Sequence, residues 1–314
     1  MSDDGPRLHT GTPIPPRLVA SVAGWPKQEG LTPGWLASVP EAVAELCVRW
    51  DIALAPVIPE TFITLVLLGH SAQLGPVVIK SSPLADEFRA EATALRLAAS
   101  EDVARQYDVD LERSVMVIEQ IVPGTQLRHV AMSDDDATRL AAETVATMWR
   151  PVPDPSGLYP LRHWMRALFD WSPRRAQIAT ELIEEAQAVA TILLARSTRT
   201  CLLHGDFQHH NLLRRNSGAW AIIDPKGLIG DPGFEVAAWM YNPPGVVERD
   251  DYLDLVRRRI EICSNVWGID RKDLVGWAFV GAVLSVCWSV DDATPEGLRG
   301  SFEQGARQLR TLLS

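Results

Sequence analysis

The chain has 314 residues, of which 46% are hydrophobic and 22% charged, and its 30 basic and 40 acidic residues give a formal net charge of −10. This length is enough for two lobes around a substantial buried core, and the composition is that of an ordinary globular protein rather than a disordered chain. The acidic excess disfavours a general nucleic-acid binder, and without a run of about 18 uninterrupted apolar residues no membrane-spanning helix is expected.

The N-terminal third is expected to contain a small sheet. Residues 1–40 are rich in proline and are expected to form a leader that packs against the body of the protein. Short runs of β-branched and apolar residues then indicate strands, and residues 69–75 indicate a hairpin loop between two of them. Residues 86–99 carry apolar side chains at helical spacing, which predicts one helix crossing this sheet. The predicted strands are 52–58, 61–68, 76–80 and 115–121.

The rest of the chain, after the turn signal at Pro123-Gly124, is predicted to be mostly helical. Two short apolar strands, 201–203 and 220–223, interrupt the helices and are joined by a polar loop. This order of elements, strands first and helices later, predicts an α+β fold. The predicted helices are 134–149, 164–171, 175–196, 251–267, 274–290 and 296–313.

The polar loop carries the residues with the clearest chemistry. It runs from His204 through Asp206 to Asn211, and the strand that follows it ends at Asp224. Phosphoryl transfer needs a carboxylate that orients the attacking hydroxyl and accepts its proton, together with oxygen ligands for Mg²⁺. Asp206 supplies the first carboxylate, Asn211 a metal-ligating amide and Asp224 a metal carboxylate. The pattern predicts a Mg²⁺-dependent phosphotransferase.

A zinc site is the competing interpretation of the three histidines in this loop, His204, His209 and His210. Neighbouring histidines such as His209 and His210 point in different directions in most local structures, and no cysteine supports them as ligands. We therefore expect His204 to hydrogen-bond the backbone of the loop instead of binding a metal.

The loop, with its pattern HGDxxxxN, resembles that of the aminoglycoside phosphotransferase and choline-kinase superfamily, relatives of protein kinases, which have HRDxxxxN. The segments Ile223-Asp224-Pro225-Lys226 and Gly230-Asp231-Pro232 resemble more narrowly the branch that contains streptomycin 6-kinases and hydroxyurea-type antibiotic kinases. The likeness runs from about residue 48 to 312. It implies a bilobal protein-kinase-like fold, with a nucleotide-binding lobe at 1–121 and a helical lobe at 122–314 that holds the catalytic loop and the acceptor pocket.

The resemblance implies a role for each polar residue of the catalytic segment. Asp206 resembles the catalytic base, and Asn211 and Asp224 resemble the Mg²⁺ ligands. Asp231 resembles the buried carboxylate that holds the catalytic loop in place, and His204 is expected to support the same loop.

The resemblance also implies a nucleotide site in the first lobe, for ATP or GTP as phosphate donor. Lys80 resembles the lysine that meets the α and β phosphates. Glu91 resembles the helix partner of that lysine, although Glu87 lies one turn earlier on nearly the same face. The carbonyl of Glu119 and the amide of Ile121 would meet the purine.

The turn expected to cover the phosphates, Val57–Thr61, departs from the family pattern. It contains no glycine, Pro59 lacks an amide hydrogen, and Glu60 would repel phosphate oxygens. Either Thr61 and a few backbone amides suffice to hold the phosphates, or nucleotide binding is altered or weak. The departure bears on nucleotide affinity more than on the class of reaction.

The acceptor pocket is expected in the helical lobe after the metal motif. Carboxylates there would pair with ammonium or guanidinium groups of the acceptor, and aromatic faces would add cation–π attraction. The candidate residues for this pocket are Glu235, Trp239, Tyr241, Asn242, Trp288, Asp291 and Asp292.

Three functions follow from these residues. The first is a kinase that phosphorylates a hydroxyl of a cationic, streptomycin-like antibiotic and so confers resistance, without a nucleic-acid or membrane partner. The second is a kinase of the same fold that acts on another small alcohol or amine. The third is a nucleotide-binding protein without turnover, which the glycine-free turn favours and the intact catalytic segment opposes. Four scattered cysteines are typical of the reducing cytoplasm.

Overall fold

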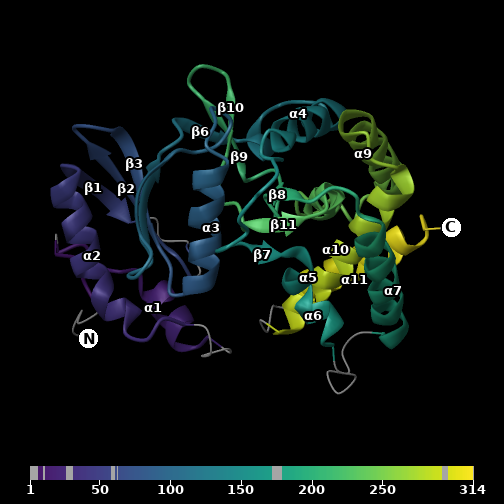
Figure 1. The fold of residues 1–314 in the computed structure, drawn as a ribbon, viewed down its shortest axis with the longest axis horizontal. Helices are drawn as coiled ribbons and strands as arrows, with labels where there is room; N and C mark the ends of the chain where they lie inside the picture. The colour runs from purple at the N-terminus through teal and green to yellow at the C-terminus, as the bar shows by residue number, and fades with distance from the viewer. Residues whose placement is uncertain are drawn as a thin grey trace.

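A computed structural model describes most of the chain, and the elements form a sheet region next to a larger helical region (Figure 1). Strands β1, β2 and β3 lie with helices α1 and α2 at one end, and the later helices lie at the other end. The described residues are 6–9, 11–25, 31–57, 61, 63–171, 179–291 and 296–313.

The N-terminal sheet has five antiparallel strands in the order β1-β2-β3-β5-β4. The predicted strand 61–68 begins only at Leu65. The predicted hairpin at 69–75 is confirmed, but its loop is shorter than those bounds, because Gly69 pairs with Val77 and Ser71 with Gly75. Strand β4 was not predicted, since all five of its residues are partly exposed and no alternation of apolar residues marks it. The strands are β1 Ile52–Val57, β2 Leu65–Ser71, β3 Gly75–Ser81, β4 Gln106–Asp110 and β5 Val115–Glu119.

Helices cover both faces of this sheet. Helices α1 (Pro16–Ala23) and α2 (Trp35–Arg49) pack on the face that carries Val115 and Val117. Helix α3 (Ala85–Leu97) packs on the opposite face with Met116 and Ile118, as the two-residue period of a strand requires. Because Lys80 pairs with Met116, the Lys80 side chain lies on the α3 face.

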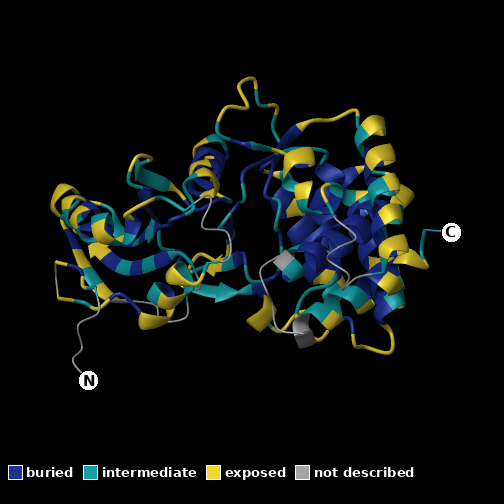
Figure 2. Cartoon of the chain, turned by 90° about the horizontal axis from the view of Figure 1, so that it is seen from below, coloured by how far each residue is buried: buried dark blue, intermediate teal, exposed yellow. Residues whose placement is uncertain are grey.

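The helical region is built around α10. Most of its side chains are buried in the core, and Figure 2 shows buried residues in dark blue. The segment Arg271–Val290 is long and apolar enough to cross a membrane by composition, but 78% of its most apolar window is buried inside the protein. The predicted helix 164–171 is broken into the short helices α5 and α6. The helices are α4 Asp134–Ala146, α5 Leu161–Trp164, α6 Arg166–Phe169, α7 Thr180–Arg196, α8 Val236–Met240, α9 Tyr252–Trp267, α10 Arg271–Asp291 and α11 Glu296–Arg310.

Two small sheets lie between these regions, and each contains one of the two short strands that the sequence predicted here. The strands at 201–203 and 220–222 are not partners: β8 pairs with β11, and β10 pairs with β9. The polar loop after β8 therefore passes from one sheet to the other. The strands are β6 Pro123–Gln126, β9 Leu212–Arg215 and β10 Trp220–Ile222 in one sheet, and β7 Tyr159–Pro160, β8 Cys201–Leu203 and β11 Leu228–Gly230 in the other.

One large hydrophobic cluster joins the two regions. It contains Phe88 of α3 and Met116 of β5 as well as the side chains of α10. The lobe boundary between residues 121 and 122 therefore stays a prediction, because the core is shared across it.

Candidate active site

The loop from His204 to Asn211 is organised by a buried histidine. The Nε2 of His204 donates a hydrogen bond to the carbonyl of Ile223 (2.9 Å), and its Nδ1 accepts one from the amide of Asp206 (3.2 Å). Burial lowers the pKa of His204 to about 4, so the ring is neutral and can accept at Nδ1. The histidine thus ties the loop to the end of β10, as the sequence indicated.

Glu235, rather than Asp231, holds the backbone of this loop. Its carboxylate accepts hydrogen bonds from the amides of His204 (2.5 Å) and Gly205 (3.1 Å). Asp231 instead accepts from the amide of Gly233 (2.7 Å) and caps the short 3₁₀ helix Pro232–Glu235. The prediction that Asp231 supports the loop is wrong, because this helical turn carries Glu235 under the loop and leaves Asp231 at its start.

Glu235 also does not belong to the acceptor pocket. The residue is only 2% exposed, and burial raises the pKa of its carboxyl to about 7. The sequence placed this carboxylate in the pocket because it follows the metal motif. A buried side chain that accepts hydrogen bonds from two backbone amides cannot also reach a ligand.

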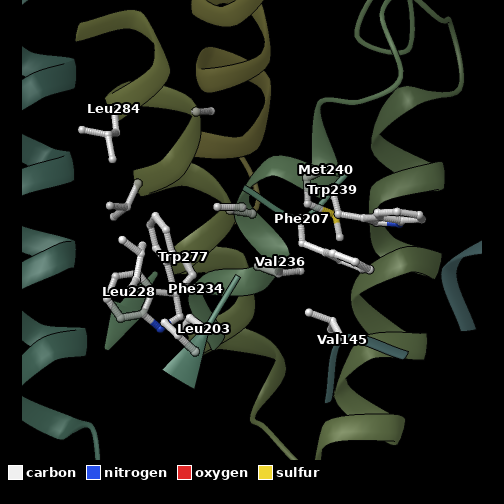
Figure 3. Packing of buried hydrophobic residues seen from close by; sticks show 14 of the residues in the cluster. Val145, Leu203, Phe207, Leu228, Phe234, Val236, Trp239, Met240, Trp277 and Leu284 are labelled. Atoms are coloured by element: carbon white, nitrogen blue, oxygen red, sulfur yellow. The ribbon is translucent and has the colours of Figure 1, made fainter. Parts of the chain in front are cut away.

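Asp206 itself faces a cavity, and its neighbour anchors it. The side chain of Phe207 is buried and stacks on Trp239, and the two ring centres are 5.9 Å apart. Figure 3 shows both side chains within the hydrophobic core. The carboxylate of Asp206 accepts a hydrogen bond from Gln208 (2.9 Å), and burial raises its pKa to about 6. Asn211 donates to the Asp206 carbonyl (2.9 Å), so its side chain closes the loop.

Asp224 lies at the centre of a charged cluster. Lys80 contacts one oxygen of its carboxylate, and Lys226 donates to the other (2.7 Å). Lys80 also donates to Glu91 of α3 (2.6 Å). Burial alone would raise the pKa of Asp224, but the ammonium groups of Lys226 and Lys80 outweigh burial and hold it well below its usual range. The structure therefore brings Lys80, Glu91 and Asp224 together.

Two features of the backbone make this cluster possible. Asp224 has a positive φ of 60°, which is uncommon for a residue with a side chain and turns its carboxylate toward both lysines. Gly227 has a φ of 67°, and a Cβ atom there would lie 2.1 Å from the carbonyl oxygen of Ala90. The segment after Lys226 therefore lies directly on the backbone of α3, next to Glu91.

The predicted purine contacts lie where the sheet region meets the helical region. The Glu119 carboxylate pairs with Arg215 of β9 (3.1 Å to Oε2), and Ile121 packs beside Ala104 and Ala221. Contact of these two backbones with a purine stays a prediction. Of the predicted phosphate-covering turn, Ile58, Pro59 and Glu60 lie outside the described residues, and the Thr61 hydroxyl has no hydrogen-bond partner among the residues that are described.

A cavity of about 900 Å³ opens next to Asp206 and Lys226. Aromatic residues form part of its wall, among them Trp164, Tyr241 and Trp288. Trp164 and Trp288 meet edge to face, 5.3 Å between ring centres. Tyr241, Asn242 and Trp288 of the predicted set therefore line the cavity.

The other predicted pocket residues do not contribute in the same way. Trp239 is buried, stacks on His209 at 3.8 Å and donates to Thr138 (3.1 Å), so its assignment to the pocket is wrong. Helix α8 turns this ring into the core instead of the cavity. The side chain of Asp291 and the whole of Asp292 lie outside the described residues.

Carboxylates that were not predicted as pocket residues line the cavity instead, and one of them, Glu87, had been considered only as an alternative partner of Lys80. They come from the start of α3, from the end of α6 and from the loop before α9, and no pattern along the chain links them. Lys226 was also not predicted as a site residue, although its position two residues after Asp224 could have indicated it. The lining carboxylates are Asp86, Glu87, Asp170 and Glu248.

The oxygen donors fit a magnesium ion. An amide at Asn211 and a carboxylate at Asp224 are hard ligands of the kind that Mg²⁺ prefers. Among the described residues no group of three or more His, Cys, Asp or Glu side chains is placed to hold a metal. Asn211 and Asp224 would hold the ion together with water and substrate phosphates, which is usual for Mg²⁺ in phosphotransferases.

Known proteins resemble the chain over most of its length. Residues 49–293 match the family model described as aminoglycoside/hydroxyurea antibiotic resistance kinase. The streptomycin 6-kinase of Streptomyces glaucescens is 29% identical over 292 residues, which cover 90% of this chain and 92% of that protein. The hydroxyurea phosphotransferase of Kitasatospora aureofaciens is 26% identical over 271 residues, covering 83% and 77%.

Solved structures share the fold. The choline kinase LicA of Streptococcus pneumoniae superposes with a TM-score of 0.61 at 14% identity, covering 86% of this chain and 99% of that one. A thermostable mutant of the aminoglycoside phosphotransferase APH(4)-Ia, solved with AMP-PNP and hygromycin B, gives 0.59 at 15% identity, covering 86% and 98%. At these identities the likeness confirms the predicted bilobal α+β kinase fold and carries nothing further.

Proposed function

The chain belongs to the aminoglycoside/hydroxyurea antibiotic resistance kinase family, and from this membership we propose that it phosphorylates a hydroxyl of a streptomycin-like aminoglycoside. It is a phosphotransferase with an alcohol group as acceptor. The observation that carries the proposed acceptor is the position of Asp206 in the lining of an acidic, aromatic-walled cavity.

Asp206 would act as the base of the reaction. With a pKa of about 6 its carboxylate is mostly ionised at neutral pH and still basic enough to accept a proton. It would orient the acceptor hydroxyl, whose oxygen forms a bond to the γ-phosphorus. The bond from that phosphorus to the bridging oxygen breaks, its electron pair leaves with the nucleoside diphosphate, and the hydroxyl proton passes to Asp206.

The other half of the site would hold the nucleotide, ATP or GTP. Lys80, fixed by Glu91, would bind the α and β phosphates. Asn211 and Asp224 would hold Mg²⁺, which when bound neutralises the charge of the phosphates. The backbone at Glu119 and Ile121 would meet the purine. A cytoplasmic location, where such nucleotides are available, is part of the same proposal.

The walls of the cavity suit a cationic acceptor. Asp86 and Asp170 line the cavity and are exposed, and neither forms an ion pair with another described residue, so a ligand cation would displace none of these residues. The faces of Trp164 and Trp288 would add cation–π attraction. A volume of about 900 Å³ lies at the upper end of the range for drug-sized ligands and is far larger than choline needs, which favours an aminocyclitol over a small alkyl ammonium alcohol.

An acceptor panel tests the proposal. Purified protein is incubated with Mg²⁺ and labelled ATP or GTP, and with streptomycin, a second aminocyclitol antibiotic, hydroxyurea or choline. Gain of one phosphate is measured by mass. We expect transfer to streptomycin that is lost in Asp206→Asn. Transfer only to choline or hydroxyurea would establish a kinase of another small alcohol or amine, and no transfer with intact nucleotide binding would establish a binding protein without turnover.

A further inference from the structure

Two of the chain's four lysines converge on one carboxylate. The 30 basic residues comprise only Lys27, Lys80, Lys226 and Lys272 beside 26 arginines. Lys80 and Lys226 contact different oxygens of Asp224. A chain that uses arginine almost everywhere else thus carries two compact ammonium groups at this point. Arginine and lysine differ here, since an ammonium group is a point charge and a guanidinium is a planar fork.

The two lysines have different surroundings. Lys80 is held by a second carboxylate, that of Glu91 at 2.6 Å, and its side chain is 12% exposed. For Lys226 the described residues offer Asp224 as the one ion-pair partner, and its side chain is 28% exposed. Lys80 is therefore locked between two elements, whereas the ammonium group of Lys226 is held from one side.

The open side of Lys226 faces the acceptor cavity. Lys226 lines this cavity together with Asp206 and Gln208. Its main chain is held against the catalytic loop, because its amide donates to the His204 carbonyl (2.7 Å) and its Cβ lies next to Gly205, where an added Cβ would be 3.4 Å away. The side chain is thus a flexible arm on a fixed base, between the metal carboxylate and the acceptor hydroxyl's expected position.

We propose that Lys226 is a phosphoryl-binding residue, whose ammonium group contacts the oxygens of the γ-phosphoryl group as it passes to the hydroxyl held by Asp206. The inference rests on the proposed function. In this step the acceptor oxygen bonds to phosphorus, the bond to the nucleoside diphosphate breaks with its electron pair on the leaving oxygen, and the hydroxyl proton goes to Asp206. Lys226 keeps its proton and stabilises the charge on the equatorial oxygens.

Comparing the affinities for ATP and ADP distinguishes a contact of Lys226 with the γ-phosphoryl group from a purely structural role of this lysine. Affinities for ATP and ADP are measured by calorimetry with Mg²⁺ and without acceptor, for wild type, Lys226→Met, Lys80→Met and the exposed-site control Lys272→Met. Lys226→Met is expected to weaken ATP binding about tenfold more than ADP binding, the size of one charge-assisted hydrogen bond. Lys80→Met should weaken both nucleotides, and Lys272→Met neither. In turnover, Lys226→Met should lower kcat and leave the acceptor KM unchanged.

Equal effects of Lys226→Met on ATP and ADP would overturn the proposal and leave Lys226 as a counter-ion of Asp224. Thermal denaturation checks that the variant folds, and Lys226→Gln replaces it if it does not; failure of both variants to fold would also mark a structural role and overturn the proposal. Wild type that binds no nucleotide would overturn the proposed function as well. If wild type phosphorylates streptomycin and Lys226→Met keeps the wild-type ratio of ATP to ADP affinity, this inference alone is overturned and the proposed function stands.

Discussion

The transfer centre around Asp224 and the acceptor cavity beside it are both acidic, but their charges are arranged differently. In the transfer centre, Asp224, Glu91 and Glu235 are each bonded to a group from another element. In the cavity, Asp86 and Asp170 form no ion pair with other described residues. Paired charges keep a fixed geometry, which chemistry on a common phosphoryl group needs, whereas unpaired carboxylates remain available to a ligand. Changes in the first region should therefore affect rate and stability, and changes in the second should affect acceptor affinity.

The largest effect is expected from the residue shared by both regions. Asp206→Asn removes the proton acceptor and should lower kcat about a thousandfold, with ATP affinity unchanged. Steady-state kinetics and calorimetry measure the two quantities. In wild type, the base must be deprotonated, so kcat/KM should rise with pH through about 6 and level off above it. A rate that is flat between pH 5 and 7, or a variant that retains its rate, would assign the base elsewhere.

The next effect tests how closely the transfer centre is packed. In Gly227→Ala the new Cβ would lie 2.1 Å from the Ala90 carbonyl oxygen, and the variant should lose about 3 kcal/mol of unfolding free energy. Gly268→Ala is the matched control, because its φ of 66° is nearly the same and no atom lies within 4 Å of its added Cβ. It should lose about 1 kcal/mol from backbone strain alone. Urea unfolding measures the unfolding free energy of both variants. Equal losses would mean that α3 moves away from the new Cβ at little cost.

A third change separates the two carboxylates after the metal motif. Glu235→Gln weakens the hydrogen bonds that this side chain accepts from the amides of His204 and Gly205. It should lower kcat about tenfold and the free energy of unfolding by about 2 kcal/mol. Asp231→Asn affects only a cap of the short helix and should cost about 1 kcal/mol, with kcat within a factor of about two. The reverse order of these effects would restore Asp231 as the residue that holds the loop.

The smallest effects are expected in the cavity. Asp170→Asn and Asp86→Asn should each raise the KM for streptomycin about fivefold, the size of an exposed ion pair, and leave kcat and ATP affinity unchanged. The increase should shrink at high salt because such pairs are screened. Asp250→Asn, an exposed carboxylate outside the cavity, is the control. A fall in kcat without a change in KM would place Asp170 or Asp86 in the transfer centre.

Local patterns were reliable where one segment carries the whole signal. The loop from His204 to Asn211 and the strand end at Asp224 lie within 21 residues of each other, and their chemistry follows from residue type and spacing. Helix α3 was also predicted, since its apolar positions recur at helical spacing. Strand β4 and the pairing of β8 with β11 were missed, because partly exposed or very short strands have no periodicity of their own.

The amino-acid sequence by itself determined the class of reaction and the family, since a base and metal ligands on one loop and the next strand leave their signature in the order of residues. Tertiary structure alone decided the rest. It placed Glu235, and not Asp231, against the catalytic loop, and it buried Trp239 in the core. It also brought Asp86 and Asp170 into the lining of one cavity. The physical reason is that burial and pairing depend on which elements pack together. A carboxylate carries no mark in the sequence that tells whether its partner is a backbone amide, a lysine or a ligand.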